Sequence, residues 1–461
     1  MLTAEEVLAS IGSTDALENV EKLWAESMAA YPGAENIPFL KDEAIVSNLK
    51  ATGFDDEMNG QFLRAAAAIR ANDALARLSW HCYWRVFLSD KGNFPPYGWP
   101  EPECLGEDRG LIYLLPAIGY VPLVRENHRR LGFSEEVTTE TVSQVKHYCD
   151  DNFRRGHNGR LGIYQNQLGW MRYYTTDPYI RIGRLEFWLQ PSSRDIYVYR
   201  NRKTGKTIAF PPAGVTYLMD GNRLGKPEEY EGHETFTSTL EFKDGCVVGT
   251  PLSPKGYAIK EEISLPLEDW EMVFSKGDMS LGMHIPSGGG MDFEKCADSL
   301  KRAKAFFTKH FPDTPPKAVV CSSWIFNTQL QEIFPPEANL CRFQRGLYLV
   351  PCASSPGEGL WFVFLRGWPL DFATAPRETT LQKKILDYLA EGHRWRGGQM
   401  FILMDDIDNF RDGTYLDGRS AARRLACGLG SAAPRLACGL GSATRHPKKK
   451  KFFQKIRTKQ Y

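Results

Sequence analysis

The sequence lacks any apolar segment long enough to cross a membrane. Its longest nearly apolar run, residues 111–124, contains Pro116 and Pro122 and is shorter than a bilayer-spanning helix requires. We therefore interpret this run as buried core. The N-terminus, MLTAEEVLAS, is acidic and has none of the charged-then-apolar layout of a secretory signal peptide. These absences predict a cytoplasmic protein that makes no contact with a membrane.

An excess of charge of one sign is also missing. The 57 Lys and Arg residues and the 56 Asp and Glu residues leave a formal net charge of +1. Most of the positive excess sits at the extreme C-terminus, so the folded part lacks the basic balance typical of proteins that bind nucleic acid. We therefore expect no nucleic-acid partner.

Several chemical motifs are absent. The ten cysteines are scattered, without a CxxC pair and without a nearby histidine at the spacing of zinc ligands. This distribution predicts reduced thiols and no metal site. The sequence contains no P-loop, no HExxH, no GxSxG nucleophile elbow and no set of protein-kinase motifs. Those enzyme classes are excluded.

The first part of the chain has helical periodicity. Thr3 and Glu6 form a capping box, and apolar residues recur at three- and four-residue steps along 17–28, 73–87, 111–124 and 137–153. Asp73 is the predicted cap of the aromatic helix 73–87. We interpret the aromatic stripe of that helix as core, and His81 within it as a hydrogen-bonded structural residue. The sequence predicts an all-helical domain over 1–155, with the boundary in 154–159.

The part after residue 160 is rich in strands. Alternating or β-branched segments predict strands at 180–190, 195–200, 207–210, 235–242, 246–250, 263–267, 279–285, 317–322, 346–351, 360–365 and 399–404. Lys243-Asp244-Gly245 predicts a hairpin turn. Helices are predicted at 293–310, 327–333 and 379–391, the first of them capped by Asp292. The fold class is therefore α+β, with this second domain at 160–410.

One junction of strand, glycine loop and helix is the candidate binding site. It reads His284-Ile285-Pro286-Ser287-Gly288-Gly289-Gly290-Met291-Asp292. Glycines let a ligand approach the main-chain amides, and the start of a helix favours an anion such as a phosphate or pyrophosphate. A flexible connection without a ligand remains the alternative. His284 is either a general base or a residue that satisfies a local backbone group.

Three further residues are candidates for chemistry. Glu186 lies in an otherwise apolar strand, and either pairs with Arg184 or Arg181 or serves as a second acid–base group. Ser323, next to Ser322 at the end of a predicted strand, orients a substrate or caps the helix that follows. Cys321 is a conceivable nucleophile, although cysteines in strands are usually buried and inert.

These stretches resemble a known family. Trp270-Glu271-Met272-Val273, the segment MHIPSGGGM, the helix Cys296-x-x-Ser299-Leu300-x-x-Ala303 and Cys321-x-Ser323-Trp324 are similar to a bacterial family with a helical N-acyltransferase N-terminal domain and a GNAT-like C-terminal domain. The resemblance covers residues 1 to about 410. It implies a GNAT-like mixed sheet with helices on its faces.

The resemblance also implies a function. It implies an acyl-CoA-dependent N-acyltransferase, which uses acyl-CoA or acetyl-CoA as cosubstrate without a metal and transfers the acyl group to a small-molecule or peptide amine. The cofactor-binding residues would be Ile285, Ser287, Gly288, Gly289, Gly290 and Met291. The catalytic residues would be His284, Ser323 and Glu186. The alternative is a catalytically inactive GNAT-like protein that binds its ligand without turnover.

The end of the chain has a different composition. The nonapeptide RLACGLGSA occurs at 424–432 and again at 435–443, and a lysine run follows at 448–451. The segment has no apolar periodicity with which to pack on a core. We therefore predict a disordered basic tail over 411–461.

Overall fold

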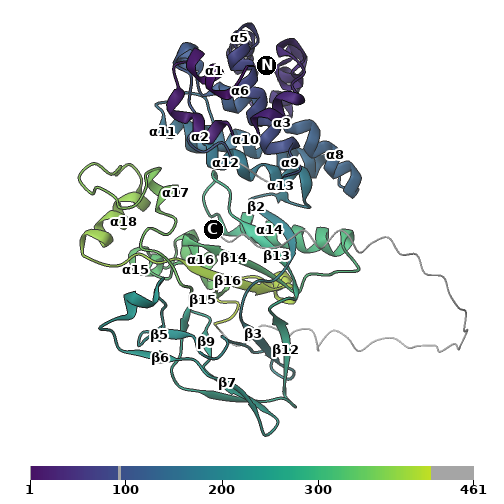
Figure 1. The fold of residues 1–461 in the computed structure, drawn as a ribbon. Helices are drawn as coiled ribbons and strands as arrows, with labels where there is room; N and C mark the ends of the chain where they lie inside the picture. Colours follow the sequence, from purple (N-terminus) through teal and green to yellow (C-terminus); the bar gives the residue numbers. More distant parts are fainter. Residues whose placement is uncertain (1, 92–94, 417–461) are drawn as a thin grey trace, which may run out of the picture. The chain divides into compact units, whose positions relative to one another are not determined.

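The computed structural model describes residues 2–91 and 95–416 of the chain (Figure 1). The described residues belong to one compact unit. A helical region comes first in the chain, and a mixed sheet with its helices follows it. Among the described residues, no helix has the length and apolar character to span a bilayer.

The helical region reaches Thr176. Its α-helices are α1 (Ala4–Ser10), α2 (Leu17–Val20), α3 (Trp24–Ala29), α4 (Asp42–Thr52), α5 (Asn59–Ala71), α6 (Asp73–Tyr83), α7 (Leu111–Ile118), α8 (Val121–Leu131), α9 (Glu135–Val142), α10 (Gln144–His147), α11 (Arg154–Gly156), α12 (Gln165–Trp170) and α13 (Arg172–Thr176). A π-helical turn, Tyr148–Phe153, joins α10 to α11. The predicted domain boundary at 154–159 stays a prediction, and α12 and α13 follow it in the chain.

The local helix signals are partly confirmed. The capping box of Thr3 and Glu6 is present at the start of α1. The cap of α6 is Asn72, not Asp73, because the Asn72 side chain accepts from the amides of Ala74 and Leu75. Asn72 has extended backbone angles, as an N-cap requires, whereas Asp73 is already helical.

The central sheet has six strands. Their order is β1 (Ile180–Ile182), β2 (Leu185–Pro191), β13 (Met279–His284), β14 (Ala318–Ser323), β16 (Gly398–Leu403) and β15 (Tyr348–Val350). All neighbours are antiparallel except β13 and β14, which are parallel. Helix α14 (Phe293–His310) connects these two parallel strands, as a parallel pair requires. Its predicted bounds and its Asp292 cap are confirmed.

Smaller sheets lie between β2 and β13 in the chain. One contains β10 (Tyr257–Ala258), β9 (Leu252–Ser253), β4 (Thr207–Phe210), β3 (Tyr197–Asn201) and β12 (Trp270–Ser275). The others contain β11 (Ile263–Pro266), β8 (Cys246–Gly249) and β7 (Leu240–Lys243), and β5 (Thr216–Leu218) with β6 (Thr235–Thr237). The hairpin at Asp244-Gly245 is confirmed, and both residues have positive φ. This antiparallel insertion separates β2 from its neighbour β13.

The last helices follow β14 in the chain. They are α15 (Leu330–Ile333), α16 (Asn339–Arg345), α17 (Leu360–Phe364) and α18 (Thr380–Ala390). Side chains of α15, α17 and α18 share a hydrophobic core of their own. The predicted strand at 360–365 is wrong, because Leu360–Phe364 forms α17. The run LWFVF is apolar throughout, so its sequence carries no period that separates a strand from a short helix.

The two faces of β2 and β13 pack against different partners. Phe187, Leu281 and Met283 belong to the core that includes the buried side of α14. Trp188, on the opposite face of β2, packs against the core of the helical region. Successive residues of a strand point to opposite faces, so Glu186 and Trp188 share the face toward the helical region.

The predicted tail falls mostly on residues 417–461, which lie outside the described residues. Residues 411–416 are described, and Tyr415 among them is buried. Its hydroxyl accepts from the amide of Leu403 (2.9 Å) and donates to Asp406 (2.8 Å). The packed chain therefore continues through the first residues of the segment predicted as tail.

Candidate functional site

A histidine and a glutamate meet on neighbouring strands. His284 at the end of β13 is the register partner of Glu186 in β2, so both side chains point to one face of the sheet. The Nδ1 atom of His284 lies 2.6 Å from Oε2 of Glu186. The glutamate is fully buried, whereas the histidine side chain is 29% exposed. The pair therefore couples a buried carboxylate to an imidazole that solvent reaches.

The other partners of Glu186 come from the helical region and the segment after it. Tyr174 donates its hydroxyl hydrogen to Oε1 (2.8 Å), and Tyr179 donates to Oε2 (3.2 Å). Burial raises the pKa of both tyrosines well above the ordinary value of 10, and the charge of Glu186 adds to that shift. Both phenols therefore remain hydrogen-bond donors at neutral pH.

The interpretation that Glu186 pairs with Arg184 or Arg181 is wrong. The Arg181 guanidinium donates to Gln144 (2.8 Å) and to the carbonyl of Gly183 (3.1 Å). The Arg184 guanidinium donates to carbonyls of the glycine loop instead. Glu186 is held by hydroxyl groups and an imidazole because its side chain points toward α13, whereas Arg184 lies in the turn between β1 and β2.

Aromatic rings surround the histidine. The ring of Trp170 in α12 lies 5.2 Å from that of His284, and 5.7 Å from that of Tyr179. Tyr179 stacks on Trp188 at 5.0 Å. A methyl group at Gly282 would lie 2.2 Å from the Trp188 indole, so only glycine leaves room for this ring. The environment of His284 is therefore apolar except for Glu186 and its hydroxyl donors.

The glycine loop, residues 285–291, offers free main-chain donors. In the described part of the chain, no hydrogen bond uses the amides of residues 287–291. The hydroxyl of Ser287 is buried and lacks a partner among the described residues. Gly288, Gly289 and Gly290 all have positive φ, which side-chain-bearing residues adopt only with strain. Free main-chain amides and an unpaired hydroxyl are what we expect of a site that binds an anion.

Arg184 fixes the direction of the loop peptides. Its guanidinium donates to the carbonyls of Pro286 (2.8 Å) and Gly290. A trans peptide points its N–H opposite to its carbonyl, so the amides of Ser287 and Met291 point away from Arg184. The main-chain amide of Arg184 in turn donates to Ser299 of α14 (2.7 Å). From the sequence, Arg184 was considered only as a partner of Glu186, and its hold on the glycine loop was missed.

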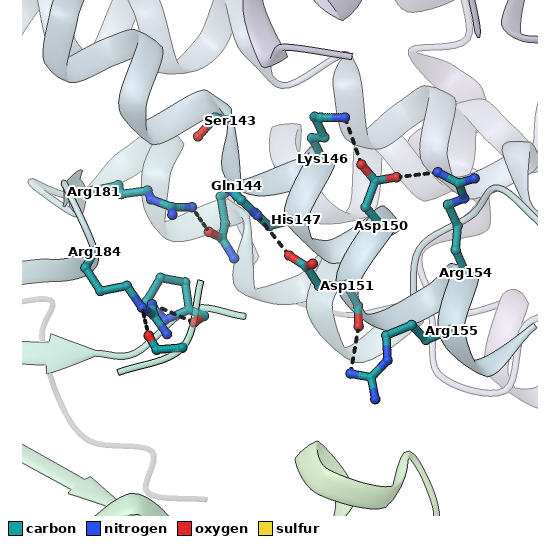
Figure 2. Close-up of polar contacts among 12 residues, drawn as sticks. Ser143, Gln144, Lys146, His147, Asp150, Asp151, Arg154, Arg155, Arg181 and Arg184 are labelled. Atoms are coloured by element: carbon teal, nitrogen blue, oxygen red, sulfur yellow. Dashed lines mark hydrogen bonds and ion pairs between the residues drawn. The ribbon is translucent and has the colours of Figure 1, made fainter. Parts of the chain in front are cut away.

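One side of the loop touches the helical region. A methyl group at Gly288 would lie 2.5 Å from Oδ2 of Asp151 and 2.9 Å from Nδ1 of His147, and these two side chains are hydrogen-bonded to each other at 2.9 Å (Figure 2). Gly290 has no atom within 4 Å of such a methyl group, so this part of the loop stays open. The helical region therefore covers the loop at Gly288 and leaves Gly289 and Gly290 accessible.

A cleft of about 460 Å³ opens beside the loop. Its lining residues are His147, Arg181, Gly183, Arg184, Gly288, Gly289, Glu294, Lys295 and Asp298. The cleft is therefore lined by the cations Arg181, Arg184 and Lys295. The carboxylates of Glu294 and Asp298, in the first turns of α14, line it as well. Asp292 caps the helix by accepting from the amide of Lys295 (2.9 Å) and takes no amide of residues 287–291. The cap therefore leaves the main-chain amide donors of the loop free.

The remaining candidates lie on β14. Ser323 accepts from the amide of Ile325 (3.3 Å) and caps the short 3-10 helix Trp324–Phe326. Its catalytic role stays a prediction. The ladder between β13 and β14 ends at Gly282 and Val320, although the strands continue to His284 and Ser323. Cys321 is buried, and burial raises the pKa of its thiol to about 12, so it is a neutral thiol at pH 7.

Sequence comparison matches both parts of the chain to known domains. Residues 44–175 match the N-acyltransferase N-terminal domain, and residues 179–402 match the GNAT-like C-terminal domain. No curated protein matches the chain.

Solved structures have the same fold. An acyltransferase in complex with decanoyl-CoA and teicoplanin has 20% sequence identity and a TM-score of 0.57, over 87% of this chain and 100% of that chain. An acyltransferase in complex with CoA and 10C-teicoplanin has 20% identity and a TM-score of 0.56, over 87% and 100% of the two chains. An acyltransferase mutant in complex with octanoyl-CoA also has 20% identity and a TM-score of 0.56, over 87% and 99%.

A helical region followed by a mixed sheet, with two parallel strands that separate at their ends around a glycine loop, is a GNAT-like fold. The chain belongs to the family in which an N-acyltransferase N-terminal domain precedes a GNAT-like C-terminal domain. This membership places it among the GNAT-like acyltransferases.

Proposed function

We propose that this protein transfers an acyl group from acyl-CoA to the amine of a small molecule. The observation that carries the proposal is the pair His284–Glu186 at the end of β13, directly before a glycine loop with free amides. The solved acyltransferases with this fold are described as complexes with decanoyl-CoA, CoA or octanoyl-CoA. One of them also contains teicoplanin, and a second contains 10C-teicoplanin. These complexes support acyl-CoA as the donor and a small molecule as the acceptor.

His284 is the proposed general base. Because Glu186 is a carboxylate acceptor, the Nδ1 atom of His284 carries the hydrogen between them and Nε2 keeps its lone pair. The acceptor nitrogen forms a bond with the thioester carbonyl carbon, and its proton moves to Nε2. Glu186 stabilises the resulting imidazolium. We assign the polarisation of the carbonyl to a main-chain N–H of β13 beyond Gly282, the last residue paired with β14.

The leaving group is the CoA thiolate. The carbon–sulfur bond breaks with its electron pair on sulfur, and the thiolate takes a proton that originates from the amine. Ser323 is proposed to have one of two roles. It either donates this proton to the thiolate or positions the substrate. Its hydroxyl accepts from Ile325 and keeps its own hydrogen available.

The proposed donor site is the glycine loop. The amides of Ser287 to Met291 would hold the pyrophosphate of CoA, with Ile285 at the base of the loop, and the cationic groups of the cleft would add to the attraction. Unpaired amides and the positive end of α14 are a binding site of the kind that phosphate groups use.

The test measures binding and turnover separately. Calorimetric titration with decanoyl-CoA reports binding, and a thiol reagent reports CoA release on addition of amines. Gly289→Trp is expected to abolish the heat of binding, because it fills the loop at its open side. Gly214 has a positive φ of 87° and open space around it, so Gly214→Trp controls for backbone strain. Heat without thiol release for any amine would select the inactive binding protein, and no heat at all would refute both.

A further inference from the structure

Two arginines at the turn between β1 and β2 have only neutral partners. The guanidinium of Arg181, a buried residue, donates to the side-chain carbonyl of Gln144 (2.8 Å) and to the main-chain carbonyl of Gly183 (3.1 Å) (Figure 2). The half-buried Arg184 donates to two main-chain carbonyls of the glycine loop. Within residues 2–91 and 95–416, neither arginine forms an ion pair. Two cations in such a place favour the binding of an anion, since no carboxylate balances them.

Contacts with both parts of the chain fix the turn that carries these arginines. The main-chain amide of Gly183 donates to the carboxylate of Glu140 in α9 (2.9 Å), and that of Arg184 donates to the hydroxyl of Ser299 in α14 (2.7 Å). Gly183 has a φ of 60°, and a methyl group there would lie 2.9 Å from the Ser299 hydroxyl oxygen. The fold itself therefore holds the two guanidiniums in place, which lowers the entropy cost of binding a ligand.

The cleft beside the glycine loop has a third cation on its wall. Lys295, in the first turn of α14, is exposed and has no carboxylate partner in the described part of the chain. The two carboxylates on the wall lie near other arginines. Glu294 lies 4.0 Å from Arg342. Asp298 lies 3.8 Å from Arg302. The cleft therefore presents three cations whose charge no ion pair among the described residues offsets.

The charges around Arg184 show the same imbalance. Burial lowers the pKa of Arg184, and the charge of Arg181 lowers it further. The thiol of Cys296 and the carboxylates of Glu186 and Asp151 act in the opposite direction. Both carboxylates are engaged with other hydrogen-bond partners. The guanidinium donors of the turn are therefore left for an anion in the cleft.

The cleft lies across the glycine loop from two of the free amides. Because Arg184 faces the carbonyls of Pro286 and Gly290, the amides of Ser287 and Met291 point to the opposite side of the loop. A pyrophosphate bound to these two amides makes no direct contact with the guanidinium of Arg184. The cleft is therefore a place for a second phosphate group, separate from the pyrophosphate.

We propose that Arg181, Arg184 and Lys295 form a subsite for a phosphate monoester in this cleft. The inference rests on the proposed function, because acyl-CoA carries such a group, the 3′-phosphate of its ribose, in addition to its pyrophosphate. Guanidiniums bind phosphate oxygens through paired, charge-assisted hydrogen bonds, and an ammonium adds a point charge. A phosphate monoester carries about two negative charges at neutral pH, which suits a wall with three unpaired cations. A free phosphate monoester is the other source of the same group.

The first experiment compares two ligands that differ only in this phosphate. The native protein is titrated calorimetrically with CoA and with dephospho-CoA, which has a hydroxyl in place of the 3′-phosphate. The subsite predicts a Kd for CoA about tenfold or more below that for dephospho-CoA, since charge-assisted hydrogen bonds are lost with the phosphate. No heat with either ligand would refute the donor site of the proposed function, and the titration with free phosphate below then decides the subsite.

The second experiment removes the cations one at a time. Arg181→Met is expected to bring the two Kd values within about threefold of each other, and Lys295→Met to reduce the preference for CoA about threefold. Arg184 is left in place, because it also holds the glycine loop. Lys309→Met is the matched control, since it removes the same charge from the last turn of α14.

Two results of this comparison would overturn the subsite for the 3′-phosphate. The first is a preference for CoA that persists in both Arg181→Met and Lys295→Met, which would place the phosphate elsewhere. The second is an equal loss of preference in Lys309→Met, which would show that only the net charge of the protein matters.

The third experiment separates the two sources of the phosphate. Inorganic phosphate is titrated into the native protein, into Arg181→Met and Lys295→Met, and into Lys309→Met as control. If CoA and dephospho-CoA bind alike, or not at all, phosphate binding that only the first two variants weaken assigns the subsite to a free phosphate monoester. Absence of phosphate binding in that case overturns the subsite. The proposed donor site fails only if neither form of CoA binds, so the two failures are distinguishable.

Discussion

The carboxylate of Glu186 is fully buried, yet its hydrogen-bond partners are Tyr174, Tyr179 and His284 rather than a lysine or arginine. A buried charge that is held by neutral hydroxyl groups lowers the stability of the fold, so we expect it to serve the function of the site. Here it fixes the imidazole by its Nδ1 atom and turns Nε2 outward. The arrangement is therefore one that stabilises an imidazolium.

The substitution Glu186→Gln tests this role. We expect it to lower kcat/KM for CoA release by about 100-fold or more, because the amide holds the ring but supplies no negative charge. The affinity for acyl-CoA should stay unchanged, since the glycine loop is untouched. The measurement is the pH profile of kcat/KM for the native protein and for Glu186→Gln, with Tyr173→Phe as the control variant. A variant with native rates would show that the carboxylate only supports the structure.

The sequence allowed some of these residues to be found. His284 and Glu186 stood out as polar residues in strands, but the sequence did not predict their pairing, which the register of β2 and β13 provides. Tyr174, Tyr179 and Trp170 were missed, because their roles depend on how α12 and α13 meet the sheet. The only signal was the aromatic content of residues 170–179, which is equally typical of an ordinary core.

At the scale of the element, the cap of α14 sets the charge at the loop. Asp292→Asn is expected to tighten CoA binding about two- to fivefold, because a carboxylate at a helix N-terminus repels a phosphate there. Stability should hardly change, since asparagine caps as well as aspartate. Calorimetry at low salt measures the effect, with Glu5→Gln in the first turn of α1 as control. Unchanged or weaker binding would place the phosphates away from this helix.

Strand β13 depends on a glycine. Gly282→Ala is expected to destabilise the protein by about 1–3 kcal/mol, because the added methyl group would lie 2.2 Å from the indole of Trp188. Urea unfolding measures the change, and tryptophan fluorescence reports the displaced ring. The double variant with Trp188→Leu should recover most of the loss, since it removes the clash. A failure to recover would show that backbone strain, not the indole, is responsible.

Long elements were easier to predict than short ones. Helix α14 was correct in its bounds and its cap, because it has a wide apolar stripe and a clear start signal. The five-residue α17 was predicted as a strand, and α16 was not predicted. Their formation depends on packing against α18 and β15, and such contacts leave no periodic trace in a segment of five to seven residues.

At the scale of the whole molecule, buried histidines make stability depend on pH. His81 is hydrogen-bonded to Ser27 (2.6 Å) and to the carbonyl of Val20 (2.8 Å), as a structural histidine. Burial lowers the pKa of His81 to about 3 and that of His128 to about 4, from an ordinary value of 6.5. Between these values and 6.5 the unfolded chain binds more protons than the folded one, so acid favours unfolding.

We expect the free energy of unfolding to fall by roughly 2 kcal/mol per histidine between pH 6.5 and pH 5. Urea unfolding at both pH values, at constant ionic strength, measures the loss. His128→Gln should lose less stability than the native protein over this range. His393→Gln, which replaces an exposed histidine, should show the native dependence. A native slope in His128→Gln would exclude His128 as a source.

The order of domains could be predicted from the change in periodicity near residue 160 and from the family resemblance. The way in which the two parts share a site could not. The contacts of Gly288 with His147 and Asp151 join residues far apart in sequence, and a single sequence carries no signal of such pairing.

The position of Glu186 has a consequence for recombination between relatives. Its carboxylate belongs to the sheet, whereas Tyr174, one of its hydroxyl partners, belongs to α13. A chimaera joined between residues 176 and 180 would inherit the acid from one parent and that phenol from the other. Exchange of whole domains should therefore yield folded, active hybrids only from parents that agree at this position, and evolution by shuffling is constrained at the same joint.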